Sequence, residues 1–164
     1  KFSSKLCGKT RKNHFKGVVT VVNQFLDIIK PKIIYLGNKD FQQLYLIKKH
    51  MLKSKIKTRV VSCKTIREKN GVACSSRNKN LTNKELLIAS KVFYYLKKQK
   101  AYIKKNELSE MKNTINNLFR LGINKLDYLE LVNLKTLKKP TNSNKRFNLF
   151  IAYYLRNIRL IDNF

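Results

Sequence analysis

A short apolar run, residues 33–36, sets the strongest constraint on what this chain can fold into. Pro31 precedes the run and Gly37 follows it, and an apolar run of this length between turn residues is typical of a buried parallel strand. Residues 14–30 predict a helix, because apolar side chains recur there at spacings of three and four until Pro31. These apolar positions are Phe15, Val18, Val19, Val22, Leu26 and Ile29.

Helix and strand alternate once more after Gly37. Residues 41–52 return to helical spacing through Leu44, Ile47 and Met51, and Val60 with Val61 marks a second short strand. The order helix, strand, helix, strand favours an α/β layer with right-handed crossovers.

The character of the sequence changes at Thr65, where a polar, loop-like stretch begins. Thr82 and Glu85 then form a capping box, which predicts a helix over residues 86–96. A second helix is predicted over 107–121, closed by Gly122. Strands are predicted over 128–132, 147–154 and 159–161, with a turn-rich loop at 138–146. We therefore expect an α/β domain over residues 1–64 and a smaller α+β domain over residues 65–164.

The formal charge of +28 is typical of proteins that bind nucleic acids. Coding bias is a competing explanation, because lysine, asparagine and isoleucine all have A/T-rich codons. The lysines are spread through every segment, without an arginine-rich arm or a glycine-aromatic RNA-binding motif. We therefore expect no specific nucleic-acid partner. A basic chain that docks on RNA or acidic surfaces, or a non-catalytic relic, is kept as the alternative.

Composition limits the remaining classes. Hydrophobic residues make up 43% of the chain, enough for a core, and no apolar run approaches the roughly 18 to 20 residues of a membrane span. Cys7, Cys63 and Cys74 are too far apart for a Cys-x-x-Cys pair, and their odd number argues against a disulfide framework. We expect no protein-held metal, no membrane partner and a reducing, cytoplasmic setting.

Polar chemistry gathers at the end of the first predicted strand. Gly37 lacks a side chain and lets a ligand approach the backbone, at the edge where parallel sheets bind ligands. Asp40 suits either a helix cap or two ribose hydroxyls, and Lys39 suits a phosphate. Gln43 can both donate and accept, which suits a substrate with hydroxyl and carboxylate groups. We call Gly37, Lys39, Asp40 and Gln43 the strand-end corner.

A second polar cluster lies in the loop that follows Thr65. Ser75, Ser76 and Arg77 place two hydroxyls and a guanidinium in consecutive positions, a combination that suits phosphate oxygens. We call these three residues the serine loop. In isolation the cluster is better explained as a solvated loop, but together with the strand-end corner it indicates a nucleotide site.

The chain resembles the pantoate/beta-alanine ligase family. The resemblance rests on "LCGKTRKNHFKGVVTVV", "YLGNKDFQQL", "TIREKNGVACSSRN" and "RLIDN", which occur in the family's order and approximate spacing. It implies a nucleotidyltransferase-type Rossmann domain followed by a small α+β domain. It also implies an enzyme that uses ATP and Mg²⁺ to adenylate pantoate and then joins the product to beta-alanine, releasing AMP and pyrophosphate.

The resemblance assigns roles to individual residues. Gly37 and Asp40 would meet the ribose of ATP, and Lys39 would hold phosphate oxygens during attack at the α-phosphorus. Gln43 would bind pantoate, with Val21 and Val22 as walls of the pantoate pocket. Ser75, Ser76 and Arg77 would close over the phosphates. Ile66 would lie near the adenine, and the backbone of Cys74 would contact the nucleotide. No residue is assigned to metal.

The chain departs from the family pattern in three places, one of which is Cys74, where the family usually has methionine or a similar apolar residue. Arg11-Lys12-Asn13-His14 stands where the family has Arg-Pro-Gly-His, and neither His14 nor His50 lies in the H-x-G-H-like motif that binds ATP phosphates. The resemblance is therefore to the carboxyl-terminal portion of the enzyme, and we expect these residues alone to be inactive. For the intact enzyme we expect a homodimer.

Overall fold

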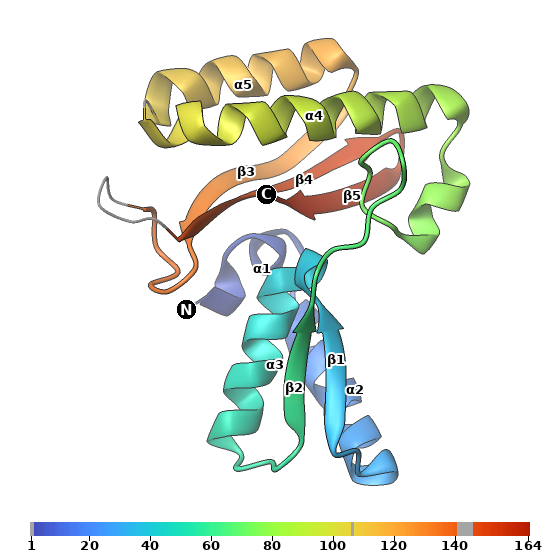
Figure 1. Cartoon of the computed structure of the whole chain (residues 1–164), viewed down its shortest axis with the longest axis vertical. Helices are drawn as coiled ribbons and strands as arrows, with labels where there is room; N and C mark the ends of the chain where they lie inside the picture. Colours follow the sequence, from blue (N-terminus) through green and yellow to red (C-terminus); the bar gives the residue numbers. More distant parts are fainter. Residues whose placement is uncertain (1, 106, 141–145) are drawn as a thin grey trace. The chain divides into compact units, whose positions relative to one another are not determined.

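The computed structural model describes residues 2–105, 107–140 and 146–164. The chain divides into two compact units, Lys1–Thr65 and Ile66–Phe164. Each unit has a sheet of its own, parallel in the first and antiparallel in the second (Figure 1).

The first unit alternates helices and strands in the predicted order. Strands β1 (Ile33–Gly37) and β2 (Arg59–Cys63) pair in parallel, in a register that runs from Ile33 opposite Arg59 to Gly37 opposite Cys63. Helix α3 connects the two strands, and connections of this kind between parallel strands are almost always right-handed. The remaining elements are η1 (Phe2–Ser4), α1 (Cys7–Thr10), α2 (His14–Ile29), η2 (Asn38–Asp40) and α3 (Phe41–Lys53).

The prediction that β1 is buried is wrong for this unit. Ile34 and Leu36 pack against the cluster that Leu26 of α2 forms with Ile47 and Met51 of α3, but Tyr35 is 66% exposed. Successive side chains of a strand point to opposite faces, so the helices cover one face of β1 and leave the other open. A continuous apolar run reports how hydrophobic a strand is, not whether both of its faces are covered.

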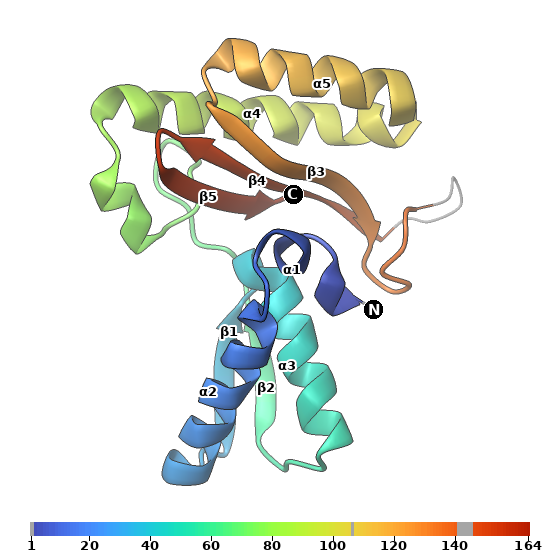
Figure 2. The same cartoon turned by 180° about the vertical axis from the view of Figure 1, so that it is seen from behind.

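The second unit packs a helical pair against an antiparallel sheet (Figure 2). The strand order is β3-β4-β5, and the predicted strands are confirmed with slightly wider bounds. Helix α5 has the predicted bounds, while α4 is longer than the predicted 86–96, because its buried face continues to Ile103. The elements are η3 (Ser76–Asn80), α4 (Asn83–Lys105), α5 (Glu107–Leu121), β3 (Lys125–Asn133), β4 (Phe147–Leu155) and β5 (Ile158–Asn163).

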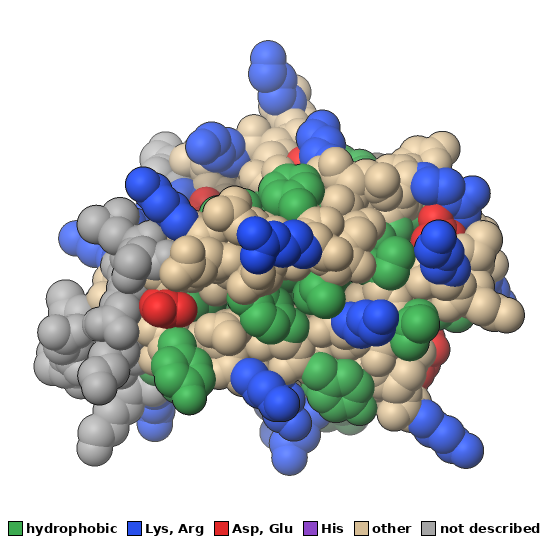
Figure 3. All heavy atoms as spheres, turned by 90° about the horizontal axis from the view of Figure 1, so that it is seen from above, with side chains coloured by type: hydrophobic (Ala, Val, Ile, Leu, Met, Phe, Trp, Pro, Cys, Tyr) green, Lys and Arg blue, Asp and Glu red, His purple; other side chains and the backbone are tan. Residues whose placement is uncertain are grey.

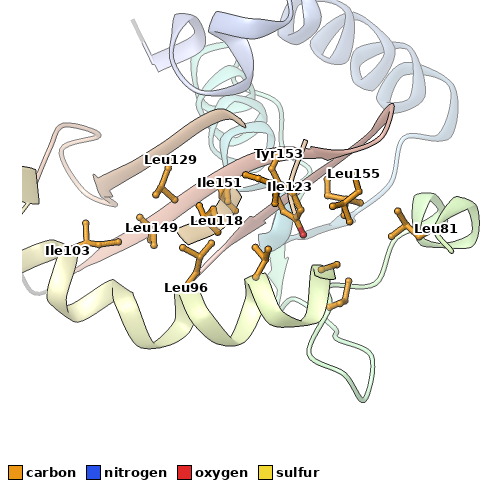
Figure 4. Close-up of a cluster of buried hydrophobic side chains, with 14 of the residues drawn as sticks. Leu81, Leu96, Ile103, Leu118, Ile123, Leu129, Leu149, Ile151, Tyr153 and Leu155 are labelled. Carbon is orange, nitrogen blue, oxygen red and sulfur yellow. The ribbon is translucent and has the colours of Figure 1, made fainter. Parts of the chain in front are cut away.

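The core of the second unit lies between the helices and the sheet (Figure 4). Leu96 of α4, Leu118 of α5 and Leu149 and Ile151 of β4 are fully buried there. Each such side chain stabilises the fold by about 1.5–3 kcal/mol relative to exposure, so this core fixes the frame that carries the serine loop. The turn-rich loop predicted at 138–146 lies partly outside the described residues, since 141–145 are not described. Across the described ranges, no helix is long and apolar enough to span a bilayer.

Candidate functional site

The strand-end corner is built where β1 turns into α3. Gly37 is the last residue of β1, the short helix η2 makes the turn, and α3 begins at Phe41. Gly37 has φ −72°, which any residue adopts, and a Cβ atom added there would meet nothing within 4 Å. Neither backbone conformation nor packing within this unit therefore requires glycine at this position. An open, side-chain-free backbone at the carboxyl end of a parallel strand fits a ligand that approaches closely.

Asp40 does not cap the helix that it precedes. It occupies the position before α3, but its side chain accepts no capping hydrogen bond and is exposed. The structural explanation offered for this carboxylate is thus wrong, and Asp40 remains available to a ligand. Lys39 and Gln43 flank it, each half-buried.

The two predicted pantoate-wall residues differ in their surroundings. Val22 packs against the Leu26–Ile47–Met51 cluster, whereas Val21 is 49% exposed. Consecutive residues of a helix point about 100° apart, so the pair spans the border between the core face of α2 and its open face.

Gln42 has a role that sequence reasoning missed. Its side chain is buried, and its Nε2 donates to the backbone oxygens of Phe2, at 2.7 Å, and Lys5, at 2.8 Å. These bonds fasten the amino-terminal turn to α3, directly beside Gln43. Adjacent glutamines on a helix point to different faces, so the pair Gln42-Gln43 itself signals that only one of them can serve a ligand at this face.

The serine loop stands at the end of a small backbone hairpin in the second unit. Arg67 and Ala73 form an isolated antiparallel bridge, and the Cys74 N–H donates to the Ile66 carbonyl at 3.0 Å. This hydrogen bond brings together two residues assigned to the adenine side, and Ile66 is 74% exposed. The Arg77 N–H then donates to Ser75 Oγ at 3.3 Å, which opens η3. A stretch predicted as loop is therefore ordered by its own hydrogen bonds.

An open cavity of about 700 Å³ adjoins the serine loop. Both hydroxyl residues reach it, whereas Arg77 is exposed and lies outside its lining. Lys79 supplies the cationic group at the wall and Glu68 the carboxylate. Hydroxyls with an ammonium group can hold phosphate oxygens. The lining residues are Glu68, Cys74, Ser75, Ser76, Asn78, Lys79 and Leu86.

An ion pair between Arg67 and Asp162 fixes the hairpin to the second unit's sheet. Arg67 donates from its two terminal nitrogens to both oxygens of Asp162, at 2.7 and 3.0 Å, and also to the Gly71 carbonyl at 3.1 Å. Its guanidinium lies 4.4 Å from the centre of the Phe93 ring. Bidentate arginine–carboxylate pairs fix orientation as well as adding energy. Asp162 belongs to β5, so the far end of the chain positions this hairpin.

A buried amide links the hairpin to the serine loop. Asn78 donates from Nδ2 to Glu68 Oε1 at 2.6 Å and to the Ala73 carbonyl at 3.2 Å. Glu68 lies before the turn of the hairpin and Asn78 lies within η3. The Asn78–Glu68 contact therefore sets where Ser75 and Ser76 stand relative to the cavity.

A second set of contacts fixes the segment that follows η3. The Thr82 capping box is confirmed, because Glu85 accepts from the Thr82 N–H at 2.7 Å and the Glu85 N–H donates to Thr82 Oγ1 at 3.3 Å. Arg156, in the β4–β5 turn, donates to both Glu85 oxygens and to the Asn80 carbonyl. The Arg156 hydrogen bond, with those from Thr82, lowers the pKa of Glu85 to about 2. The sequence indicated the capping box but carried no signal for its arginine partner.

Comparisons with known proteins agree over the whole chain. The family model for pantoate-beta-alanine ligase matches residues 1–164. The chain belongs to this family. Pantothenate synthetase of Flavobacterium psychrophilum is 38% identical over 159 residues, covering 95% of this chain and 56% of the relative. That of Francisella tularensis subsp. novicida is 38% identical over 157 residues, covering 96% and 52%. The chain thus spans about half the length of the curated pantoate-beta-alanine ligases it matches.

Solved structures of the pantoate-beta-alanine ligase family share the fold. Pantothenate synthetase from Thermus thermophilus superposes on 99% of this chain with a TM-score of 0.88 at 26% identity, using 60% of its own length. The Francisella tularensis ligase, solved with beta-gamma ATP and beta-alanine, gives a TM-score of 0.79 at 36% identity and matches over 54% of its length. The expected nucleotidyltransferase-type α/β fold with a following α+β part is confirmed.

Proposed function

We propose that this chain supplies part of the site at which ATP activates pantoate for ligation to beta-alanine. The observation that carries the proposal is the strand-end corner: packing among the described residues does not require a glycine at Gly37, and the nearby Asp40 carboxylate caps no helix there. The family membership and the ATP and beta-alanine bound to the Francisella relative support it.

The proposed reaction has two steps. A pantoate carboxylate oxygen attacks the α-phosphorus of ATP, and the bond to the pyrophosphate leaving group breaks. The amine of beta-alanine then attacks the carbonyl carbon of the adenylate and AMP leaves, with a proton lost from nitrogen. Positioning and charge stabilisation carry most of such chemistry, since the reacting groups need in-line geometry.

Each described group has a proposed part in this sequence. The Asp40 carboxylate accepts from the ribose hydroxyls beside the open backbone of Gly37. Lys39 offsets charge that develops on the α-phosphate, and Gln43 orients pantoate against Val21 and Val22. The hydroxyls of Ser75 and Ser76 hold the terminal phosphates, with Arg77 closing over them, and Ile66 and Cys74 flank the adenine.

In this proposal magnesium would be bound mainly by the phosphates of ATP. Among the described residues, no three His, Cys, Asp or Glu side chains gather in a way that could hold a metal ion. Mg²⁺ in nucleotide sites keeps several waters and binds the phosphates plus one or two carboxylates. Glu68, the carboxylate of the cavity lining, is the residue that suits it. The ion would neutralise phosphate charge there.

The remaining parts of the proposal follow the family. Relatives are nearly twice as long as this chain, so we propose that histidines from a further segment complete the phosphate site. We propose that the complete enzyme is a cytoplasmic homodimer.

The proposal is tested by two glycines that share one structural property. A Cβ atom at Gly17, inside α2, would also meet nothing within 4 Å. We would fuse the segment of the Francisella relative that precedes its match ahead of Lys1, and compare Gly37→Ala with Gly17→Ala. Both variants should fold as stably as the parent or slightly better, because alanine restricts the unfolded chain.

Only Gly37→Ala should weaken the binding of ATP, because the alanine methyl group would occupy the space of the ribose. We expect at least about a tenfold rise in the apparent dissociation constant of ATP, the effect of losing about 1.4 kcal/mol of contact. Equal ATP affinity in the two glycine variants would remove the strand-end corner from the nucleotide site.

A further inference from the structure

One face of helix α4 carries a regular pattern that the proposed enzyme site does not use. Lysines alternate with apolar side chains along it, in the order Lys84, Leu87, Lys91, Tyr94, Lys98 and Tyr102. At 3.6 residues per turn these six positions fall within about 80° of arc and extend over about 27 Å of helix. We call them the lysine–tyrosine stripe.

The stripe is exposed along its whole length. Leu87 is 56% exposed, Tyr94 49% and Tyr102 60%, and all three lysines are exposed as well. Seen from the side of the helical pair, hydrophobic and basic side chains interleave over this face, with few acidic ones among them (Figure 3). Core packing explains the opposite face of α4, with Val92, Leu96 and Ile103, and leaves the stripe without an explanation.

The charge of the stripe is not neutralised by the described residues. Lys84, Lys91 and Lys98 pair with no carboxylate among them. Glu85, an acidic residue of α4, is turned away toward Arg156. Elsewhere in this unit the carboxylates of Asp127 and Asp162 have arginine partners, so the stripe concentrates unbalanced positive charge beside exposed rings.

We propose that the lysine–tyrosine stripe binds single-stranded RNA. Lysines that follow a phosphate backbone, interleaved with aromatic rings on which bases stack, are how proteins hold single strands without reading sequence. Duplexes fit less well, because their bases are already stacked and cannot cover Tyr94 and Tyr102. The Tyr94 ring is steadied by an edge contact with Phe93, at 5.0 Å between centroids, and so offers a face at little further ordering cost.

A lipid surface fits this pattern poorly. Helices that lie in a membrane interface separate an apolar face from a basic one and sink the apolar face into the lipid. Here the lysines and the apolar residues share one face, and the other side of α4 is committed to the core. The proposal therefore commits to RNA and leaves anionic lipid as an outcome of the test.

The test must separate this stripe from the charge of the whole chain. Fluorescence anisotropy of a labelled oligouridine about 12 nucleotides long, within the usual site size, would be followed against the 164-residue chain over a range of salt. The double variant Tyr94→Ala, Tyr102→Ala keeps every charge and should bind at least about tenfold more weakly. The double variant Tyr94→Phe, Tyr102→Phe keeps both rings and should bind as the parent does.

Lysine variants test the electrostatic half of the proposal. Lys91→Gln with Lys98→Gln should lower the slope of log affinity against log salt by about 1.4, or about 0.7 for each lost phosphate contact. The matched control, Lys69→Gln with Lys135→Gln, removes the same charge from exposed lysines outside α4 and should change affinity less than about threefold. Equal losses in the two lysine pairs would show that only total charge matters, and would overturn the proposal.

A measurement on the unaltered chain does not depend on how the variants fold. Ultraviolet crosslinking to the same oligouridine, followed by peptide mass spectrometry, should place crosslinks at Tyr94 and Tyr102. Crosslinks confined to other segments would contradict the proposal. So would binding to phosphatidylserine vesicles that Tyr94→Ala, Tyr102→Ala abolishes while RNA binding is unchanged.

Discussion

Replacing Asp162 by asparagine should loosen the hairpin that carries the serine loop. Arg67 donates to both Asp162 oxygens, and the two side chains are 23% and 11% exposed, so the pair is largely shielded from water. Asparagine removes the charge and leaves one acceptor oxygen. Hydrogen bonds to charged groups contribute about 1.5–3 kcal/mol, and we expect Asp162→Asn to lower the free energy of unfolding by about 2–3 kcal/mol.

The matched control is Asp127→Asn in the same sheet. Asp127 pairs with Arg159 at 2.7 Å, with side chains 7% and 12% exposed. Both partners of this pair belong to the sheet, whereas the Arg67–Asp162 pair joins the sheet to the hairpin. Urea unfolding followed by circular dichroism would give the free energies, and amide hydrogen exchange would report locally. The amides to follow are those of Glu68 and Cys74, which bond across the hairpin.

Local exchange decides between positioning and general stability. Both variants should lose stability, but only Asp162→Asn should speed exchange at Glu68 and Cys74 by more than the global loss explains. The same excess in Asp127→Asn, or none in Asp162→Asn, would refute the role assigned to the Arg67–Asp162 pair.

Three further predictions concern single side chains. In the fused enzyme, Lys39→Ala should slow adenylate formation by about 10² to 10³-fold. Near-normal pyrophosphate release by this variant would show that Lys39 is an ordinary solvated lysine with no role in the reaction. Gln43→Ala should weaken the binding of pantoate while leaving ATP affinity unchanged, and the reverse result would contradict the assignment of Gln43 to the pantoate site. The depressed pKa of Glu85 means that its pair with Arg156 stabilises the fold fully above the ordinary value of 4.5, and that this contribution is lost as pH falls toward about 2. Urea midpoints of the parent should therefore fall more steeply over that window than those of Glu85→Gln, and parallel curves would show that the pair does not contribute.

Local signals in the sequence predicted the elements well. Helix α5 and the capping box at Thr82 rest on short-range chemistry: side-chain spacing, a terminal glycine and a hydroxyl three residues before a carboxylate. Such features need no knowledge of the rest of the fold. Helix α4 was predicted too short, because lysines and a glutamine dominate its later turns, where the core of the unit buries Ile103.

Long-range contacts could not be predicted from the sequence. Arg67 and Asp162 stand 95 positions apart, and Arg156 and Glu85 stand 71 apart. In a chain with so many basic residues, nothing local distinguishes these two arginines from the others. The same holds for Gln42, whose partners are backbone oxygens of another segment. The sequence indicated the residues predicted to bind ligand, because they form local clusters of polar side chains. The residues that hold those clusters in place became visible only in the structure.

One measurement tests the central claim most directly. The 164-residue chain and its fusion to the preceding segment of the Francisella relative would be assayed side by side for pantothenate formed from pantoate, beta-alanine and ATP. We predict that the fusion forms pantothenate with equimolar AMP and pyrophosphate, and that Lys39→Ala in the fusion suppresses it. The chain by itself should form none, because phosphoryl transfer tolerates little misplacement and half of the phosphate-binding groups would be absent. Turnover by the 164 residues unaided, or a folded fusion that stays silent, would contradict the account.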